Sequence, residues 1–229
     1  MNFRNFCAGA VAVASMAVAA PASAAITLDF SGLNGDAAEL VQEFYNGGTG
    51  SLGSTGPNYG ISFSDNAIAC SVQPLGVCNS AALPSGGNLL YFLDGGAATM
   101  NVAAGFDTGF SFFYSAVNDP AFVTVYDGLD GTGNVLATLN LPLTPNGSNI
   151  PGCFGSNFCP YSPIGVAFGG IARSVDFGGS QNQVAFANIT IGSITPGNGG
   201  IPEPATWAMM IIGFTGVGAA LRRRRLALA

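Results

Sequence analysis

Short runs in which apolar and polar residues alternate are the feature that most limits how this chain can fold. Such runs occur at 26–30, 59–64 and 110–112. The β-branched and aromatic run 122–126 is followed by a Gly- and Asp-rich turn at 127–133 and an alternating run at 134–141, which predicts a β-hairpin. Further strands are expected at 89–93, 99–103, 164–168, 174–177 and 183–191. About ten short strands separated by Gly, Asn, Pro and Asp turns predict an all-β fold, an antiparallel β-sandwich or jelly roll.

One segment, 36–45, has helical spacing instead, with Glu39 and Glu43 four residues apart. These are the only glutamates between residues 25 and 200, so they are the obvious pair for glycoside hydrolysis, which uses two carboxylates. A catalytic pair flanks the scissile bond from opposite sides, whereas this spacing puts both side chains on one face. We therefore expect both glutamates on a solvent-exposed face.

Charged residues are scarce, at 8 % of the 229 residues, and the chain has neither His nor Lys. These absences remove Ser-His-Asp and Cys-His catalysis, His-ligated metals and Schiff-base chemistry. Between residues 25 and 200, eleven acidic residues face one basic residue, Arg173, which gives a net charge of −10. Nucleic-acid binding needs basic clusters, so we expect no nucleic-acid partner. We also expect no cofactor and no enzymatic activity.

The first 24 residues have the three parts of a secretory signal peptide. Arg4 forms a short positive region, an uncharged apolar run covers 7–20, and small residues close the segment at 21–24. The apolar run is shorter than the ~20 residues that a membrane span needs. We therefore expect residues 1–24 to be removed by cleavage after Ala24.

A second apolar segment lies near the C-terminus, at 205–221, where 17 residues carry no charge. At ~1.5 Å per residue a helix of this length reaches ~25 Å, enough for a slightly short transmembrane helix. Trp207 stands at one end, where an amphipathic ring suits the membrane interface, and an Arg block follows at the other. Such a block favours the cytoplasmic side, so the segment predicts a single inner-membrane anchor.

A specific motif surrounds this anchor. Its elements are Pro202, Glu203 and Pro204, then Trp207, Ala208 and Met209, and finally Arg222, Arg223, Arg224 and Arg225. In this order they resemble the PEP-CTERM sorting signal of Gram-negative bacteria, in the form common among sphingomonad-type bacteria. The same type of tail also occurs on proteins labelled ice-binding, and the tail alone does not show ice binding.

The resemblance implies a route of export. An exosortase, a membrane-embedded cysteine transpeptidase or protease, would recognise the tail and cleave near Pro-Glu-Pro, where two prolines forbid a helix. The precursor would be anchored in the inner membrane, and its product would reach the cell surface or the exopolysaccharide matrix. The expected organisation is a signal peptide at 1–24, an exported β-sandwich at 25–198 and a sorting and anchor segment at 199–226.

Four cysteines remain after the signal peptide. They form two close pairs, Cys70 with Cys78 and Cys153 with Cys159. Export to an oxidising compartment makes disulfides the default, and of the three connectivities we favour the two local ones. Each pair brackets Gly, Pro and Asn residues that can form a compact loop, worth ~2–3 kcal/mol in the chain-entropy model. The spacing fits a zinc site poorly.

Other candidate residues have ordinary structural interpretations. Asp127 and Asp130 are weak candidates for Ca²⁺, which needs six to eight oxygen ligands, and an Asp-Gly hairpin turn explains them better. Five tyrosines are candidates for stacking on sugar rings, although most fit core or strand-edge positions: Tyr45, Tyr59, Tyr91, Tyr114 and Tyr126.

Two segments of the body also resemble patterns of other exported proteins that carry this tail. One combines 44–48 with 56–64, and the other runs from 175–179 through 184–192. The second resembles a last strand often written F-D-N-I-T, but this chain has Ala187 at the position of the acid.

The expected function is a structural or adhesive role at the cell surface, with exopolysaccharide as a partner. The alternative is a carbohydrate- or ice-binding module, and a polysaccharide hydrolase ranks third. Exposed tyrosines on one sheet would favour sugar binding, and a flat Thr-rich face would favour ice. Two carboxylates facing each other across a cleft would favour the hydrolase.

Overall fold

A computed structural model of the chain describes residues 25–197 and Gly213. Several predicted features lie outside the described residues: the signal peptide with its cleavage at Ala24, the Pro-Glu-Pro motif, the Arg block and, apart from Gly213, the membrane span at 205–221. Within the described part, no helix is both long and apolar enough to cross a membrane.

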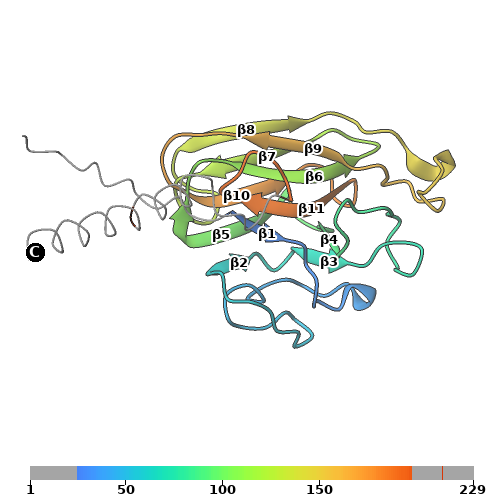
Figure 1. Cartoon of the computed structure of the whole chain (residues 1–229), viewed down its shortest axis with the longest axis horizontal. Coiled ribbons are helices and arrows are strands. Elements are labelled where there is room, and N and C mark those ends of the chain that lie inside the picture. The colour runs from blue at the N-terminus through green and yellow to red at the C-terminus, as the bar shows by residue number, and fades with distance from the viewer. Residues whose placement is uncertain (1–24, 198–212, 214–229) are drawn as a thin grey trace, which may run out of the picture. The chain divides into compact units, whose positions relative to one another are not determined.

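Eleven strands in the described residues form two antiparallel sheets that face each other (Figure 1). The strands are β1 (Ile26–Leu28), β2 (Ile61–Phe63), β3 (Ile68–Cys70), β4 (Leu89–Tyr91), β5 (Ala97–Phe106), β6 (Phe110–Ala116), β7 (Ala121–Tyr126), β8 (Val135–Leu141), β9 (Ser162–Val166), β10 (Ala172–Gly178) and β11 (Val184–Ile191). Two short 3-10 helices, η1 (Gly35–Ala37) and η2 (Gly147–Asn149), lie in the connections. The prediction of an all-β antiparallel sandwich is confirmed.

The strand order of each sheet brings distant parts of the chain together. The first sheet has the order β3-β4-β11-β6-β9, and β1 also pairs with β11. The second has the order β2-β5-β10-β7-β8. The predicted hairpin is present as β7 and β8, with Val123 opposite Leu139. Strand β9 begins two residues before the predicted 164–168, and β3 was not predicted.

Phenylalanine rings from both sheets fill the core. Phe177 of β10 lies 6.1 Å from Phe112 and 5.0 Å from Phe186 between ring centroids, in edge-to-face arrangements. Phe110 lies 5.9 Å from Phe177, and all four side chains are fully buried. The apolar residues of the alternating strands therefore meet between the two layers.

The helix predicted at 36–45 is wrong. Only η1 forms there, and the chain then continues through turns. Ala38 has a φ of 52° and Gln42 has a φ of 43°, both in the left-handed region that an α-helix cannot contain. The segment is shaped instead by hydrogen bonds to distant residues.

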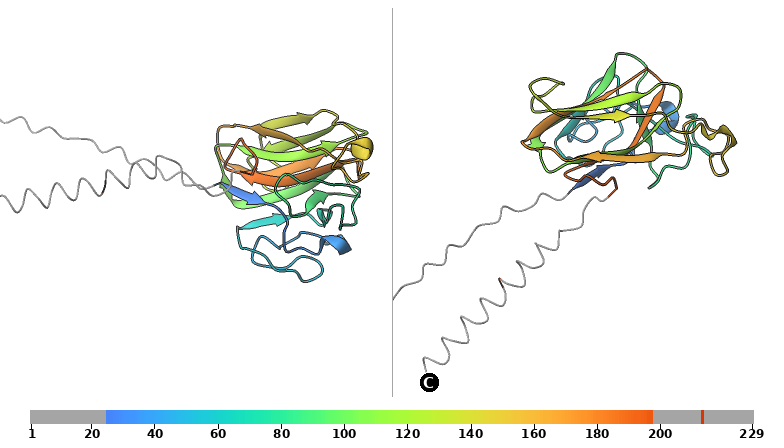
Figure 2. Two further views of the ribbon diagram at one scale, coloured as in Figure 1. Left: turned by 45° about the vertical axis from the view of Figure 1, so that its right-hand side comes forward. Right: turned by 90° about the horizontal axis from the view of Figure 1, so that it is seen from above.

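The chain enters and leaves the sandwich at the same end. Ile26 pairs with Ile191 at the end of β11, and Ala25 lies beside Gly192. The following segment, 193–197, lies against the outer face of the first sheet, where the Ser111 hydroxyl donates to the Ser193 carbonyl at 2.9 Å. Figure 2 shows the start of β1 and the end of the described body close together.

Candidate functional site

Two disulfide loops cover the outer face of the first sheet at the opposite end of β11. Cys70, the last residue of β3, is bonded to Cys78, with 6.1 Å between the Cα atoms. Cys153 is bonded to Cys159 in the connection between β8 and β9, with a Cα–Cα distance of 5.7 Å. Both predicted local disulfides are therefore present in the structure.

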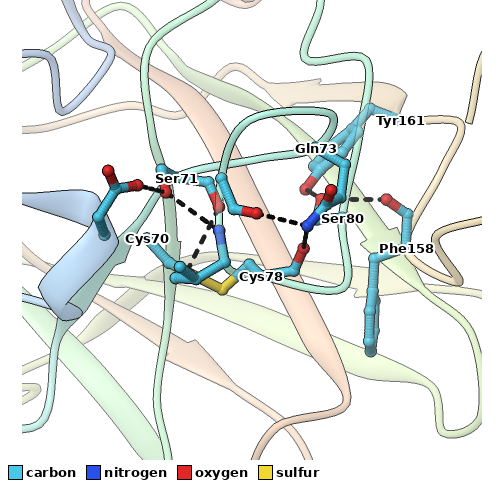
Figure 3. The surroundings of a disulfide bond; sticks show 10 residues. Cys70, Ser71, Gln73, Cys78, Ser80, Phe158 and Tyr161 are labelled. Atoms are coloured by element: carbon cyan, nitrogen blue, oxygen red, sulfur yellow. Dashed lines mark hydrogen bonds between the residues drawn. A yellow bond between two sulfur atoms is a disulfide. The ribbon is translucent and has the colours of Figure 1, made fainter. Parts of the chain in front are cut away.

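The two loops are joined by backbone and side-chain hydrogen bonds. The Phe158 N–H donates to the Asn79 carbonyl at 3.2 Å, and the Asn157 N–H donates to Asn79 Oδ1 at 2.8 Å. The Ser80 hydroxyl donates to the Phe158 carbonyl at 3.1 Å (Figure 3). Each loop is closed by a disulfide and is hydrogen-bonded to the other, so the pair forms one continuous cover over the sheet.

Below this cover, Ser80 and Tyr161 form a buried polar pair. Their hydroxyls lie 2.6 Å apart, and both side chains are buried (Figure 3). Burial raises the pKa of Tyr161 far above its ordinary value, and the hydrogen bond with Ser80 only partly opposes this effect. The pair has the properties of a structural contact that stays neutral at physiological pH.

A small cavity of about 50 Å³ lies between the first disulfide loop and the sheet. Its lining is mostly apolar, from Leu89, Val184 and Phe158, with Asn79 and Tyr91 among its polar members. Pockets for small molecules usually enclose ~300–1,000 Å³, so this space is too small for a sugar ring. The cavity can take a few water molecules or one small substituent.

The two candidate glutamates occupy different environments. Glu39 is fully buried, which corrects the expectation that it lies on a solvent-exposed face, whereas Glu43 is exposed. The Glu39 carboxylate accepts four hydrogen bonds, from the backbone N–H groups of Asn34 (2.7 Å), Leu52 (2.9 Å) and Ser54 (3.2 Å) and from the Ser54 hydroxyl (2.6 Å). A buried carboxylate with four internal donors has a structural role. It is not placed to act with Glu43 as a catalytic pair.

The same contacts determine the protonation of Glu39. Burial raises the pKa of this carboxyl, but the hydrogen bonds from Ser54, Asn34 and Leu52 together outweigh burial. The pKa of Glu39 therefore lies below its ordinary value of 4.5. The group is ionised at neutral pH because its donors replace the water that burial removes.

The two candidate calcium ligands lie in the turn between β7 and β8. Asp127 accepts from the backbone N–H of Asn134 at 2.7 Å and from its side-chain amide at 2.8 Å, and these bonds lower the pKa of Asp127. Asp130 exchanges two hydrogen bonds with Asn101, at 2.6 and 2.8 Å. Over residues 25–197 and 213, no group of three or more His, Cys, Asp or Glu side chains is placed to hold a metal ion. Asp127 is therefore an acceptor within the turn, and Asp130 joins the turn to Asn101 of β5.

The candidate tyrosines divide by exposure. Tyr45 and Tyr114 are buried, Tyr91 and Tyr126 are half-buried, and Tyr59 is 42 % exposed. Burial raises the pKa of Tyr45, Tyr91 and Tyr114. Most of these side chains thus belong to the core or to strand edges, and Tyr59 is the one whose ring is most open to solvent.

Several residues that join the two disulfide loops were not identified from the sequence. Asn79, Ser80, Phe158 and Tyr161 join the loops, yet none of them belongs to an alternating strand. Their one available signal was position, since each lies within two residues of a disulfide cysteine. Nearness to a cysteine shows where these residues lie in the chain, but it does not show which residues they contact.

No curated protein sequence matches this chain. Among solved structures, the body is similar to the K2 cleaved adhesin domain of Lys-gingipain, with 11 % identity, 73 % of this chain and 97 % of that chain covered, and a TM-score of 0.43. It is also similar to CsCBM6-3 from Clostridium stercorarium in complex with cellobiose, with 15 % identity, 59 % and 86 % covered, and a TM-score of 0.35. At such TM-scores the similarities carry no argument about function.

A family match at the C-terminus is specific. Residues 200–225 match the PEP-CTERM protein-sorting motif. The matched residues include the Pro-Glu-Pro run, the apolar segment after it and the Arg block. The chain therefore carries a PEP-CTERM protein-sorting motif and is an exported protein.

Proposed function

We propose that this protein has a structural or adhesive role at the cell surface or in the exopolysaccharide matrix, without enzymatic activity of its own. In this proposal residues 1–24 are removed on export, 25–198 form the exported body, and 199–226 anchor the precursor in the inner membrane. An exosortase-type enzyme would then process the tail near Pro202, Glu203 and Pro204.

One observation carries the proposal: both chain ends of the described body lie at one end of the sandwich, and both disulfide loops lie at the other. The chain enters at Ala25 and leaves at Gly197 at one end, so the sorting segment follows from that end. The disulfide loops, joined to each other, lie at the other end of β11 (Figure 1). Such an arrangement suits a protein that is held near a membrane at one end and presents a braced surface at the other.

The use of the carboxylates supports a role without catalysis. The Glu39 carboxylate accepts four internal hydrogen bonds, Asp127 accepts from Asn134 within the turn between β7 and β8, and Asp130 accepts from Asn101 of β5. A glycoside hydrolase needs two carboxylates that face each other across the substrate. The glutamate pair that the sequence offered does not supply this geometry.

Cell fractionation tests the proposal. The full chain and a variant ending at residue 198 are expressed in a host with the exosortase system and followed with an antibody against the body. We expect the full chain in the surface and matrix fraction, sedimenting with the exopolysaccharide, and the shortened chain in the periplasm or the medium. Full chain that stays in the inner membrane, or is freely soluble in the medium, would contradict the proposal.

A further inference from the structure

Tyr59 presents an ordered aromatic ring on the surface of the body. Its side chain is 42 % exposed, and its ring is stacked on that of Tyr45, with 6.0 Å between centroids and 14° between planes. Tyr45 is only 2 % exposed. One side of the Tyr59 ring thus rests on a buried partner while much of the residue remains open to solvent.

Tyr45 is itself firmly held. Its hydroxyl accepts a hydrogen bond from the Phe30 N–H at 2.8 Å, and its ring makes edge contacts with Phe30 and Phe44 at centroid distances of 5.9 and 4.8 Å. The Tyr59 N–H donates to the Tyr45 carbonyl at 2.8 Å. Because the Tyr59 ring is already oriented, binding a flat ligand on it would cost little side-chain freedom.

Three polar side chains lie on the two chain segments that carry Tyr45 and Tyr59. Glu43, Asn46 and Asn58 are all exposed. Asn46 Nδ2 donates to Glu43 Oε2 at 2.7 Å, and Asn58 Oδ1 accepts from the Gly60 N–H at 3.1 Å. The segments touch at Gly47, where a Cβ atom would lie only 2.8 Å from Asn58 Nδ2. An exposed aromatic ring can stack on the C–H face of a sugar ring, and an exposed carboxylate and two amides on the same segments can hydrogen-bond sugar hydroxyls.

Resting on the proposed role in the exopolysaccharide matrix, we propose that Tyr59, with Glu43, Asn46 and Asn58, is a stacking site for a neutral sugar unit of a polysaccharide. The body carries a net charge of −10, which repels polyanionic polymers and favours neutral ones. The cavity under the disulfide loop is too small for a sugar ring, so the open Tyr59 face is the better site.

Affinity electrophoresis of the full chain in mild detergent tests this site. The gels contain laminarin, galactomannan or xylan as neutral probes, or alginate as an anionic probe. We expect at least one neutral polymer to retard the wild-type protein and alginate to leave its mobility unchanged. Tyr59→Ala should weaken the retarding interaction at least tenfold, and Tyr59→Phe, which keeps the ring, should bind within about threefold of wild type.

Phe122→Ala is the matched control, because Phe122 is 44 % exposed on β7 and makes no aromatic stack within the described residues. It should bind like wild type. Asn46→Ala, which changes one exposed side chain, should weaken binding severalfold. It replaces Tyr59→Ala as the test variant if Tyr59→Ala fails to fold. Unchanged binding in the folded Tyr59→Ala or Asn46→Ala protein would overturn the proposal. The proposal would also fail if alginate retarded the wild-type protein more strongly than the neutral polymers, or if none of the neutral polymers retarded it. If these results occur while the full chain still sediments with the matrix, only the sugar site fails and the proposed function stands.

Discussion

Replacing Glu39 with Gln tests whether a buried carboxylate organises the segment between β1 and β2. The two oxygens of Glu39 each accept two hydrogen bonds: Oε2 from Asn34 and the Ser54 hydroxyl, and Oε1 from the backbone of Leu52 and Ser54. A glutamine keeps one oxygen and replaces the other with an NH₂ group that cannot accept. If the NH₂ group replaces Oε2, the Ser54 hydroxyl can rotate to accept from it, and only the Asn34 N–H loses its partner.

The expected loss of stability follows from the number of hydrogen-bond donors that lose their acceptor. One buried donor without a partner costs ~1–3 kcal/mol, whereas the opposite orientation of the amide would leave two such donors. We therefore expect Glu39→Gln to lower the free energy of unfolding by about 2 kcal/mol at pH ~7. With a urea dependence of ~2 kcal/mol per molar, the unfolding midpoint should fall by ~1 M. Glu43→Gln is the matched control, and because Glu43 is exposed its effect should stay within ~0.5 kcal/mol.

The pH dependence supplies a second readout with a definite sign. The pKa of Glu39 is lower in the folded protein than its ordinary value of 4.5, so the stability it contributes is present above that value. It is lost as the pH falls through the folded pKa, because protonation removes the acceptor. The difference in unfolding free energy between wild type and Glu39→Gln should therefore shrink on acidification from pH ~7 to ~3. Equal midpoints at neutral pH, or a difference that grows in acid, would refute the assigned role of Glu39.

Two further predictions concern the described body, and a third concerns the sorting motif. Burial raises the pKa of Tyr45 and Tyr161, so in a spectrophotometric titration these two should ionise only with unfolding at alkaline pH, above the ordinary range of a tyrosine. If all six tyrosines of the chain ionise together near pH ~10 while the protein stays folded, that burial is wrong. Reduction of both disulfides should lower the unfolding free energy by ~4–6 kcal/mol, and peptide mapping of the oxidised protein should find only local cross-links. Glu203→Ala should leave membrane insertion intact while full-length precursor accumulates, and membrane fractionation that shows parental processing would mean that the tail is only an anchor.

The sandwich was predictable because each long strand carries its own signal. Phe122 to Tyr126 and Val135 to Leu141 alternate or are β-branched, and a Gly- and Asp-rich turn joins them, so local pattern and tertiary pairing agree. Strand β3 gave no such signal, since its three residues Ile68–Cys70 are all buried and show no alternation. A short buried run of this kind cannot be distinguished from a loop by periodicity.

The environment of Glu39 could not be predicted for a different reason. Its helical spacing with Glu43 is a local property, whereas its donors come from Asn34, Leu52 and Ser54, up to fifteen residues away. Positive φ angles at Ala38 and Gln42 then remove the helix that the spacing suggested. The contacts between the two disulfide loops share this limit, because the sequence showed where each loop closes but not what each loop touches.

The buried carboxylate and the exposed ring belong to one structural unit. The sequence patterns at 44–48 and 56–64 form two arms that are bridged at Thr49 and Thr55, and Glu39 binds the backbone of the tip between them. Gly56 lies so close to the Phe44 ring that a Cβ atom would overlap it, which fixes one arm against the other. Tyr59, Asn46 and Asn58 lie on these arms, and Glu39 holds the tip that joins the arms through the backbone of Leu52 and Ser54. A segment with little regular secondary structure can thus present an ordered surface, because the buried Glu39 carboxylate binds backbone N–H groups of the segment while the Tyr59 ring stays exposed.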